Sequence, residues 1–282
     1  MKERITPPGT IVEQKGSIED FHGGRIVTCV GTQEDFSRND SWPVRQTDTV
    51  LVDYYGNNDE TWTRLKQKSA GRETYVISAL DSFNKESRNY ADCTGIVAVG
   101  VDKETGENIS FLTHQDGKKI LTADGPLKEV HEQFIADLRA SLSELKDRSK
   151  TGSIDLVIFG GWAEGFGGGF YPYSAEEYKR SVQMIGNLCE EVLQIDPDVA
   201  IGPNAEPTRD GYDEHGNGTI RDFDVQVVFD TINRRLYMVR PEQPTGPSRD
   251  PHHPVEQNTN RTFKASQIEE EEKYWTDSTW QD

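Results

Sequence analysis

The chain has 282 residues, of which 33% are hydrophobic, and its formal net charge is −18. An acidic surface repels phosphate groups, so the charge argues against nucleic acid as a partner. No apolar run approaches the roughly 18–20 residues of a membrane span, and no secretory pattern follows the first residues, so we expect no membrane partner and a cytoplasmic location, or secretion without a conventional signal peptide.

Three short strands are expected within residues 1–86, which we treat as an N-terminal extension. Each is a cluster of β-branched and other apolar residues between polar, turn-forming stretches. They span residues 25–30, 48–54 and 74–80. The extension is therefore expected to be rich in β-structure, with short strands.

A β-hairpin forms the centre of the predicted core, which we place at residues 87–240. Residues 96–101 are continuously apolar, which predicts a strand buried on both faces. The turn at 102–107 contains Thr105-Gly106, and residues 109–114 return as the partner strand.

Helices alternate with shorter strands through the rest of the core. Apolar residues at steps of three or four predict two amphipathic helices, the second ending before Pro197. The expected elements, in chain order, are a helix at 127–145, a strand at 154–159, a helix with inward residues from Val182 to Val192, a strand at 199–201, and a hairpin of 223–229 with 235–239. This mixed order favours an α+β fold over a regular βαβ repeat.

Residues 241–282 differ in composition from the core. Prolines punctuate a polar stretch that begins at 241, and an acidic run covers 269–272. A segment with so few apolar residues buries too little surface to offset the entropy of ordering, so we expect a mostly flexible, Pro-rich and acidic tail.

The three cysteines are too few and too scattered for a disulfide framework or a zinc site, and we expect neither a metal nor a cofactor. Cys29, inside a predicted strand, and Cys189, on the inward face of a predicted helix, occupy positions typical of core packing. Cys93 differs because it immediately precedes the buried central strand, where a side chain is held rigidly and can border a cleft.

Cys93 and His114 are the candidate nucleophile and base. The thiolate is the reactive form of cysteine, and a neighbouring imidazole raises its population and can protonate a departing amine. A hairpin folded about residue 105 puts His114 opposite residue 96, about 10 Å along the strand from Cys93. Contact then requires a bulge or kink before Ile96. The alternative is that Cys93 only fills space and His114 is a satisfied strand-end histidine.

Two segments near these residues are candidates to border a substrate. Gly95 lets the backbone approach a ligand closely, and amide groups of the turn at Thr94 are placed to stabilise an oxyanion. The pair Gly160-Gly161 ends the strand at 154–159. It lacks the spacing of a phosphate-binding loop, so we interpret it as a loop beside the cleft.

These residues resemble a known group of enzymes. The segment from Cys93 to Val99, followed by Leu112-Thr113-His114, resembles the core of the CheD-type chemoreceptor glutamine deamidases. The segment from Val157 to Gly161 and the elements after it follow in the same order. Leu112-Thr113-His114 with Asp116-Gly117 is also similar to the protein N-terminal asparagine amidohydrolases. The catalytic domain of the cytotoxic necrotizing factors belongs to the same structural group, and the resemblance covers about residues 87–240.

The resemblance implies a β-sandwich flanked by helices and a Cys–His active site. In the deamidases a threonine six residues before the cysteine completes the site. Ser87 holds that position here and keeps a hydroxyl group, while Asn89 and Asp92 are alternatives for the third role.

The expected function is hydrolysis of a Gln or Asn side-chain carboxamide in a protein substrate. Cys93 would form a thioester, with His114 as base and then acid. Two alternatives stay open. One is transglutaminase-type acyl transfer at the same residues, and the other is a catalytically silent binding domain.

Overall fold

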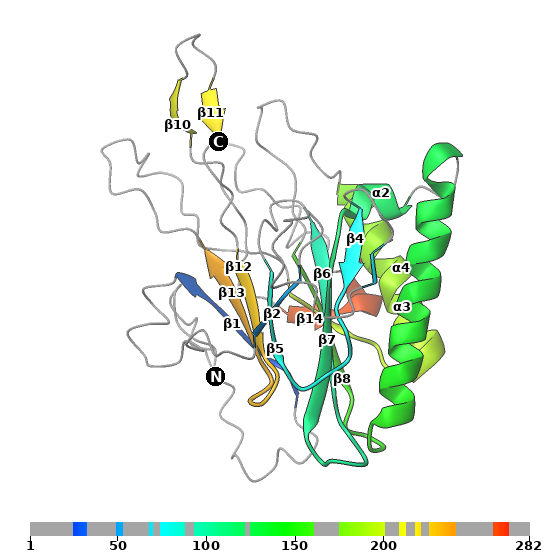
Figure 1. Cartoon of the computed structure of the whole chain (residues 1–282). Helices are drawn as coiled ribbons and strands as arrows, with labels where there is room; N and C mark the ends of the chain where they lie inside the picture. The colour runs from blue at the N-terminus through cyan, green and yellow to red at the C-terminus, as the bar shows by residue number, and fades with distance from the viewer. Residues whose placement is uncertain are drawn as a thin grey trace, which may run out of the picture.

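Two β-sheets and a layer of helices make up the fold (Figure 1). The structure is a computed structural model that describes residues 25–32, 49–52, 68–69, 74–87, 93–121, 125–160, 175–200, 209–212, 218–220, 226–240 and 262–270. Within these residues no helix is long and apolar enough to cross a membrane. The expected α+β class is confirmed, with strands from both halves of the chain in each of the two large sheets.

The first sheet has five strands. In spatial order they are β1 (Val27–Thr32), β13 (Arg235–Arg240), β12 (Gln226–Asp230), β5 (Asn84–Ser87) and β2 (Thr49–Leu51). The hairpin of β12 and β13 was expected from the sequence. Strands of the N-terminal extension pair on either side of it: β1 runs parallel to β13, and β5 runs antiparallel to β12.

The second sheet has seven strands and contains the predicted central hairpin. In spatial order they are β14 (Thr262–Lys264), β9 (Asp198–Ala200), β8 (Asp155–Gly160), β6 (Thr94–Val101), β7 (Asn108–Gln115), β4 (Tyr75–Ile77) and β3 (Lys68–Ser69). β6 lies between β8 and β7 and is buried on both faces, as its unbroken apolar sequence predicts. A separate hairpin pairs β10 (Arg209–Tyr212) with β11 (Gly218–Ile220).

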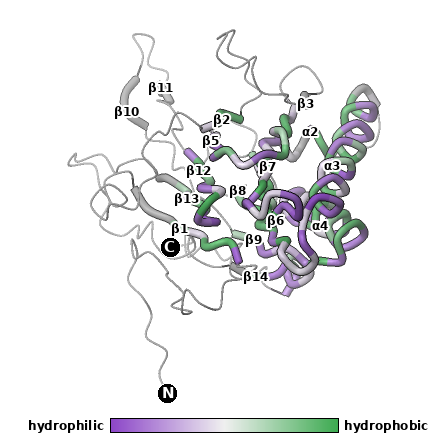
Figure 2. Tube along the Cα trace, turned by 60° about the horizontal axis from the view of Figure 1, so that its bottom comes forward, coloured by the Kyte–Doolittle hydropathy of each residue, from purple (hydrophilic) through white to green (hydrophobic). Residues whose placement is uncertain are grey.

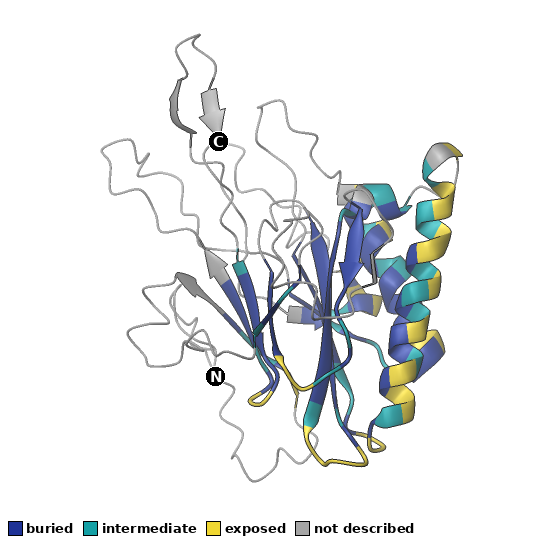
Figure 3. Cartoon of the chain, viewed as in Figure 1, coloured by how far each residue is buried: buried dark blue, intermediate teal, exposed yellow. Residues whose placement is uncertain are grey.

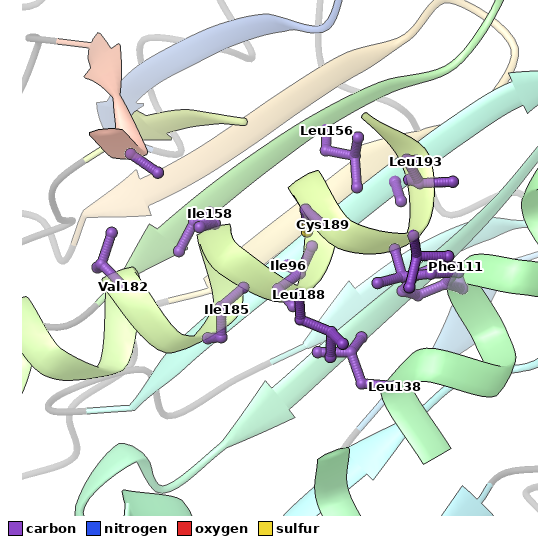
Figure 4. Packing of buried hydrophobic residues seen from close by; sticks show 14 of the residues in the cluster. Ile96, Phe111, Leu138, Leu156, Ile158, Val182, Ile185, Leu188, Cys189 and Leu193 are labelled. Carbon is purple, nitrogen blue, oxygen red and sulfur yellow. The ribbon is translucent and has the colours of Figure 1, made fainter. Parts of the chain in front are cut away.

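Helices cover one face of the seven-stranded sheet. The long ones are α3 (Lys128–Arg148), which follows a 3-10 turn, η3 (Gly125–Leu127), and α4 (Ala175–Leu193); the short α2 (Gly117–Leu121) follows β7. Both long helices carry hydrophobic and hydrophilic residues side by side along their length (Figure 2). Their apolar stripes face the sheet, where residues of α4 such as Ile185 and Cys189 pack near Ile96 and Ile158 of the strands (Figure 4).

The two faces of the seven-stranded sheet border two different cores. Its central strands are buried along most of their length, whereas α3 has exposed residues along its outer side (Figure 3). Alternation along β7 shows the two cores directly, because Phe111 belongs to the core under the helices and Leu112 to the core between the sheets. The second core also takes in Cys93, Val97 and Phe229. The sheets are thus joined by a buried layer, and the candidate cysteine borders it.

Strand β5 was not expected from the sequence. Its four residues, Asn84 to Ser87, are all polar, yet all are buried. Each side chain is hydrogen-bonded: Lys85 Nζ to Asp81 Oδ1 at 2.6 Å, for example, and Asn84 Oδ1 to the Thr231 amide at 3.0 Å. Polar partners replace the apolar contacts that a sequence pattern detects. The boundary that we set between residues 86 and 87 falls inside this strand.

Part of the segment at 241–282, which was expected to be a mostly flexible tail, forms regular structure. β14 pairs antiparallel with β9, and the 3-10 turn η4 (Ala265–Gln267) follows it. Phe263, Ala265 and Ile268 are buried against the helix-side core. These three apolar residues anchor a short segment whose overall composition is polar. Residues 241–261 and 271–282 lie outside the described part of the chain.

Candidate active site

The register of β6 and β7 relates Cys93 to His114. Val97 lies opposite Leu112 and Thr94 opposite Gln115, so His114 falls across from residue 95. The expected register had His114 across from residue 96. That difference of one residue is decisive, because a one-residue shift moves a side chain to the other face of the sheet. The observed register puts both side chains on the face toward the other sheet.

Cys93 and His114, which we call the candidate pair, are therefore offset by two residues rather than three. Residues in such a diagonal relation have Cα atoms about 7–8 Å apart, a distance that an imidazole can span. The residue between them on this face is Gly95. A Cβ atom there would lie 2.4 Å from Phe159 Cζ and 2.6 Å from the Thr113 carbonyl oxygen. Only glycine fits at this crossing point.

Ser87 contacts His114 from the opposite sheet. Its Oγ lies 3.1 Å from His114 Nδ1, and its hydroxyl also bonds to the carbonyl oxygen of Val52. A serine hydroxyl has one proton, and a carbonyl oxygen can only accept, so this proton goes to Val52. Ser87 Oγ then accepts a hydrogen bond from Nδ1–H of His114. The contact selects the imidazole tautomer that carries its proton on Nδ1 and its lone pair on Nε2.

Burial keeps His114 neutral. The side chain is fully buried, and loss of solvation lowers its pKa to about 3. At neutral pH the ring is therefore an uncharged imidazole, with Nε2 able to accept a proton. Cys93 is also buried, with 2% of its surface exposed.

The other two cysteines occupy different environments, as expected. Cys189 is packed in the helix-side core, and burial raises the pKa of its thiol to about 12. Cys29 is packed with Val228 and Tyr237 on the outer side of the five-stranded sheet. All three cysteines are buried and none forms a disulfide. Within the described residues, Cys93 is the cysteine that shares a sheet face with a histidine.

The remaining predicted site residues divide into two groups. Thr94 opens β6 and is buried, paired in register with both Gly160 and Gln115. Gly160 ends β8 with a positive φ of 76°, a conformation that favours glycine. Gly161, Asn89 and Asp92 lie outside the described residues.

Two contributors to the site were not expected from the sequence. The backbone carbonyl of Val52 fixes the direction of the Ser87 hydroxyl. The other is Thr113, whose Oγ1 accepts a hydrogen bond from the Ile96 amide at 2.9 Å and donates one to Gln115 Oε1 at 2.6 Å. Backbone carbonyls carry no sequence signal, and a threonine in a strand is too common to single out.

Comparisons with known proteins give no relative. No protein-family model matches the chain, and no curated protein or solved structure matches it either. In the described residues, no group of three or more His, Cys, Asp or Glu side chains is arranged to hold a metal ion.

Proposed function

We propose that the protein hydrolyses the carboxamide of a Gln or Asn side chain in a protein substrate, with Cys93 as nucleophile. The observation that carries this proposal is the Ser87–His114 hydrogen bond. It joins a serine hydroxyl of one sheet to an imidazole of the other, and the register places that imidazole on the same sheet face as the Cys93 thiol. A hydroxyl that orients an imidazole beside a thiol is the order expected for a cysteine enzyme. The resemblance to the deamidases required a hydroxyl at position 87 in this role.

The reaction divides into two acyl transfers. Nε2 of neutral His114 takes the thiol proton as the Cys93 sulfur attacks the carboxamide carbon. The tetrahedral intermediate collapses to a thioester, and the C–N bond breaks as the imidazolium returns its proton to the departing ammonia. Water, activated by the same imidazole, then hydrolyses the thioester to a carboxylic acid and restores the thiol. Ser87 holds Nδ1–H throughout, which keeps Nε2 directed at the proton in transit.

The proposal is tested with peptides that carry an internal Gln, an internal Asn or an N-terminal Asn. We expect one class to gain about one dalton and to release one ammonia per residue converted. A primary amine added in excess distinguishes acyl transfer to amines, which would give a larger adduct instead. The proposal is contradicted if no class of peptide reacts and if proteins of a cell extract, treated in the same way, also release no ammonia.

Replacing Ser87 by alanine is expected to lower kcat by about 10–100-fold, because the imidazole loses the acceptor that fixes its tautomer. The change also leaves the Val52 carbonyl and His114 Nδ1 without this partner, at a cost of about 1–3 kcal/mol in the free energy of unfolding. Ser87→Thr keeps the hydroxyl and serves as the matched control. Steady-state kinetics and denaturant unfolding of the two variants check the prediction, and equal kinetics in both would contradict it.

A further inference from the structure

The pairing of β6 with β7 is interrupted beside the candidate pair. Thr94 pairs with Gln115 and Val97 with Leu112, but Gly95 and Ile96 between them do not take part in the ladder with β7. The Ile96 amide instead donates to the side chain of Thr113, at 2.9 Å from Oγ1. Next to His114 on β7, a side-chain acceptor thus takes the place of the backbone carbonyl that would normally bind the Ile96 amide.

The direction of this hydrogen bond is fixed by a second one. The Thr113 hydroxyl donates its only proton to Gln115 Oε1, at 2.6 Å, so its lone pairs are left for the Ile96 amide. All three residues are fully buried. Gln115 therefore determines how the hydroxyl is turned, and the hydroxyl determines where the amide of β6 is held.

The backbones are also unusually close at this level. The Thr113 carbonyl oxygen lies 2.6 Å from the position that a Cβ atom of residue 95 would take. Strand alternation puts the side chains of Thr113 and Gln115 on the helix side of the sheet, while His114 between them faces the other sheet. The two side chains are thus separated by the sheet from the reacting atoms and act on them through the backbone.

We propose that Thr113 and Gln115 are positioning residues that set the relation of Cys93 to His114. The inference rests on the function proposed above. The hydrogen-bonded chain from the Ile96 amide through Thr113 to Gln115 holds the interruption of the ladder open. The interruption in turn sets the position of His114 relative to Gly95 on the neighbouring strand. It thereby sets the distance between the imidazole and the Cys93 thiol.

Thr113→Val tests the inference, since it removes the hydroxyl and keeps the shape. Thr113→Ser keeps the hydroxyl and should restore the parent behaviour. Thr231→Val is the matched control, because Thr231 is also fully buried and its Oγ1 is hydrogen-bonded to Ser110 and the Phe83 carbonyl, both at 2.7 Å. Gln115→Met, which removes the Oε1 acceptor, is the second test in case the valine variant does not fold.

Two measurements report on the site without a substrate. One is the ¹⁵N NMR signature of the His114 ring, and the other is the pH dependence of Cys93 alkylation by iodoacetamide, expressed relative to Cys189 in the same sample. We expect Thr113→Val to shift the Nδ1 resonance and to slow alkylation of Cys93 about tenfold or more near pH 7, since small displacements of reacting groups have effects of this size. Gln115→Met should give a smaller change in the same direction.

The outcomes separate the inference from the function on which it rests. If Thr113→Val and Gln115→Met behave like Thr231→Val in both measurements, the positioning role is overturned while the proposed function stands. If Cys93 is alkylated at the same rate in the His114→Asn variant as in the parent protein, the proposed function fails, and the positioning role falls with it.

Discussion

Replacing Cys93 by serine is expected to abolish ammonia release, with a loss in kcat of at least about 10³-fold, while the fold is kept. The serine hydroxyl is a much weaker nucleophile than the thiol, and its higher pKa makes proton transfer to His114 much less favourable in a site arranged around the larger sulfur atom. The measurement is ammonia release under conditions in which the parent enzyme converts its peptide substrate. Circular dichroism and thermal unfolding establish that the variant is folded.

The chain offers a matched control for this change. Cys189 is equally buried but packs in the helix-side core, away from His114. Cys189→Ser introduces the same buried hydroxyl and should retain activity apart from any loss of stability. Full activity in Cys93→Ser, or equal losses in both variants, would remove Cys93 from the mechanism.

Acid is expected to destabilise the protein through His114. Its pKa is about 3 in the folded chain and about 6.5 when unfolded, so between these values the unfolded state binds one proton more. Stability from this group is therefore fully present above about pH 6.5 and is lost as the pH falls, at about 1.4 kcal/mol per pH unit down to about pH 3. Chemical denaturation at a series of pH values measures this slope.

His114→Asn isolates the contribution. The asparagine amide can still donate to Ser87 but does not titrate, so the variant should lose this part of the slope below pH 6.5. Asp155 acts in the opposite direction, because burial raises the pKa of its carboxyl group and its protonation in acid removes a cost. The contribution of Asp155 is the same in both proteins, so it cancels when the free energy of unfolding of the variant is subtracted from that of the parent. Parallel stability curves for the two proteins would show that His114 is not buried in its neutral form.

Hydrophobic pattern was sufficient to predict the central hairpin and both long helices. β6 has an unbroken apolar run, and α4 carries its apolar residues at helical spacing, so each shows its burial in its sequence. β5 shows none, because its burial depends on hydrogen bonds to residues far along the chain, such as Thr231. The resemblance to the deamidases was enough to propose Ser87 as a site residue. Nothing in the sequence predicted the strand that carries it.

The register of the central hairpin is the other feature that could not be predicted from the sequence. The expected register differs from the observed one by one residue. The turn at 102–107 is closed by hydrogen bonds of Asp102 with Glu107 and Gly106, and Gly106 has a positive φ of 78°. Such turn geometry sets which residues face each other but is not read from apolar periodicity. The observed register places Cys93 on the same sheet face as His114 without the bulge that the expected register required.

The central claim is that His114 activates Cys93, and competitive alkylation of the three cysteines tests it most directly. Native protein is treated with a limiting amount of iodoacetamide near pH 7, and the modified positions are quantified by mass spectrometry. We expect Cys93 to react at least about tenfold faster than Cys29 and Cys189, and His114→Asn to remove that advantage. Equal rates at all three cysteines, or an unchanged rate at Cys93 in the His114→Asn variant, would contradict the claim.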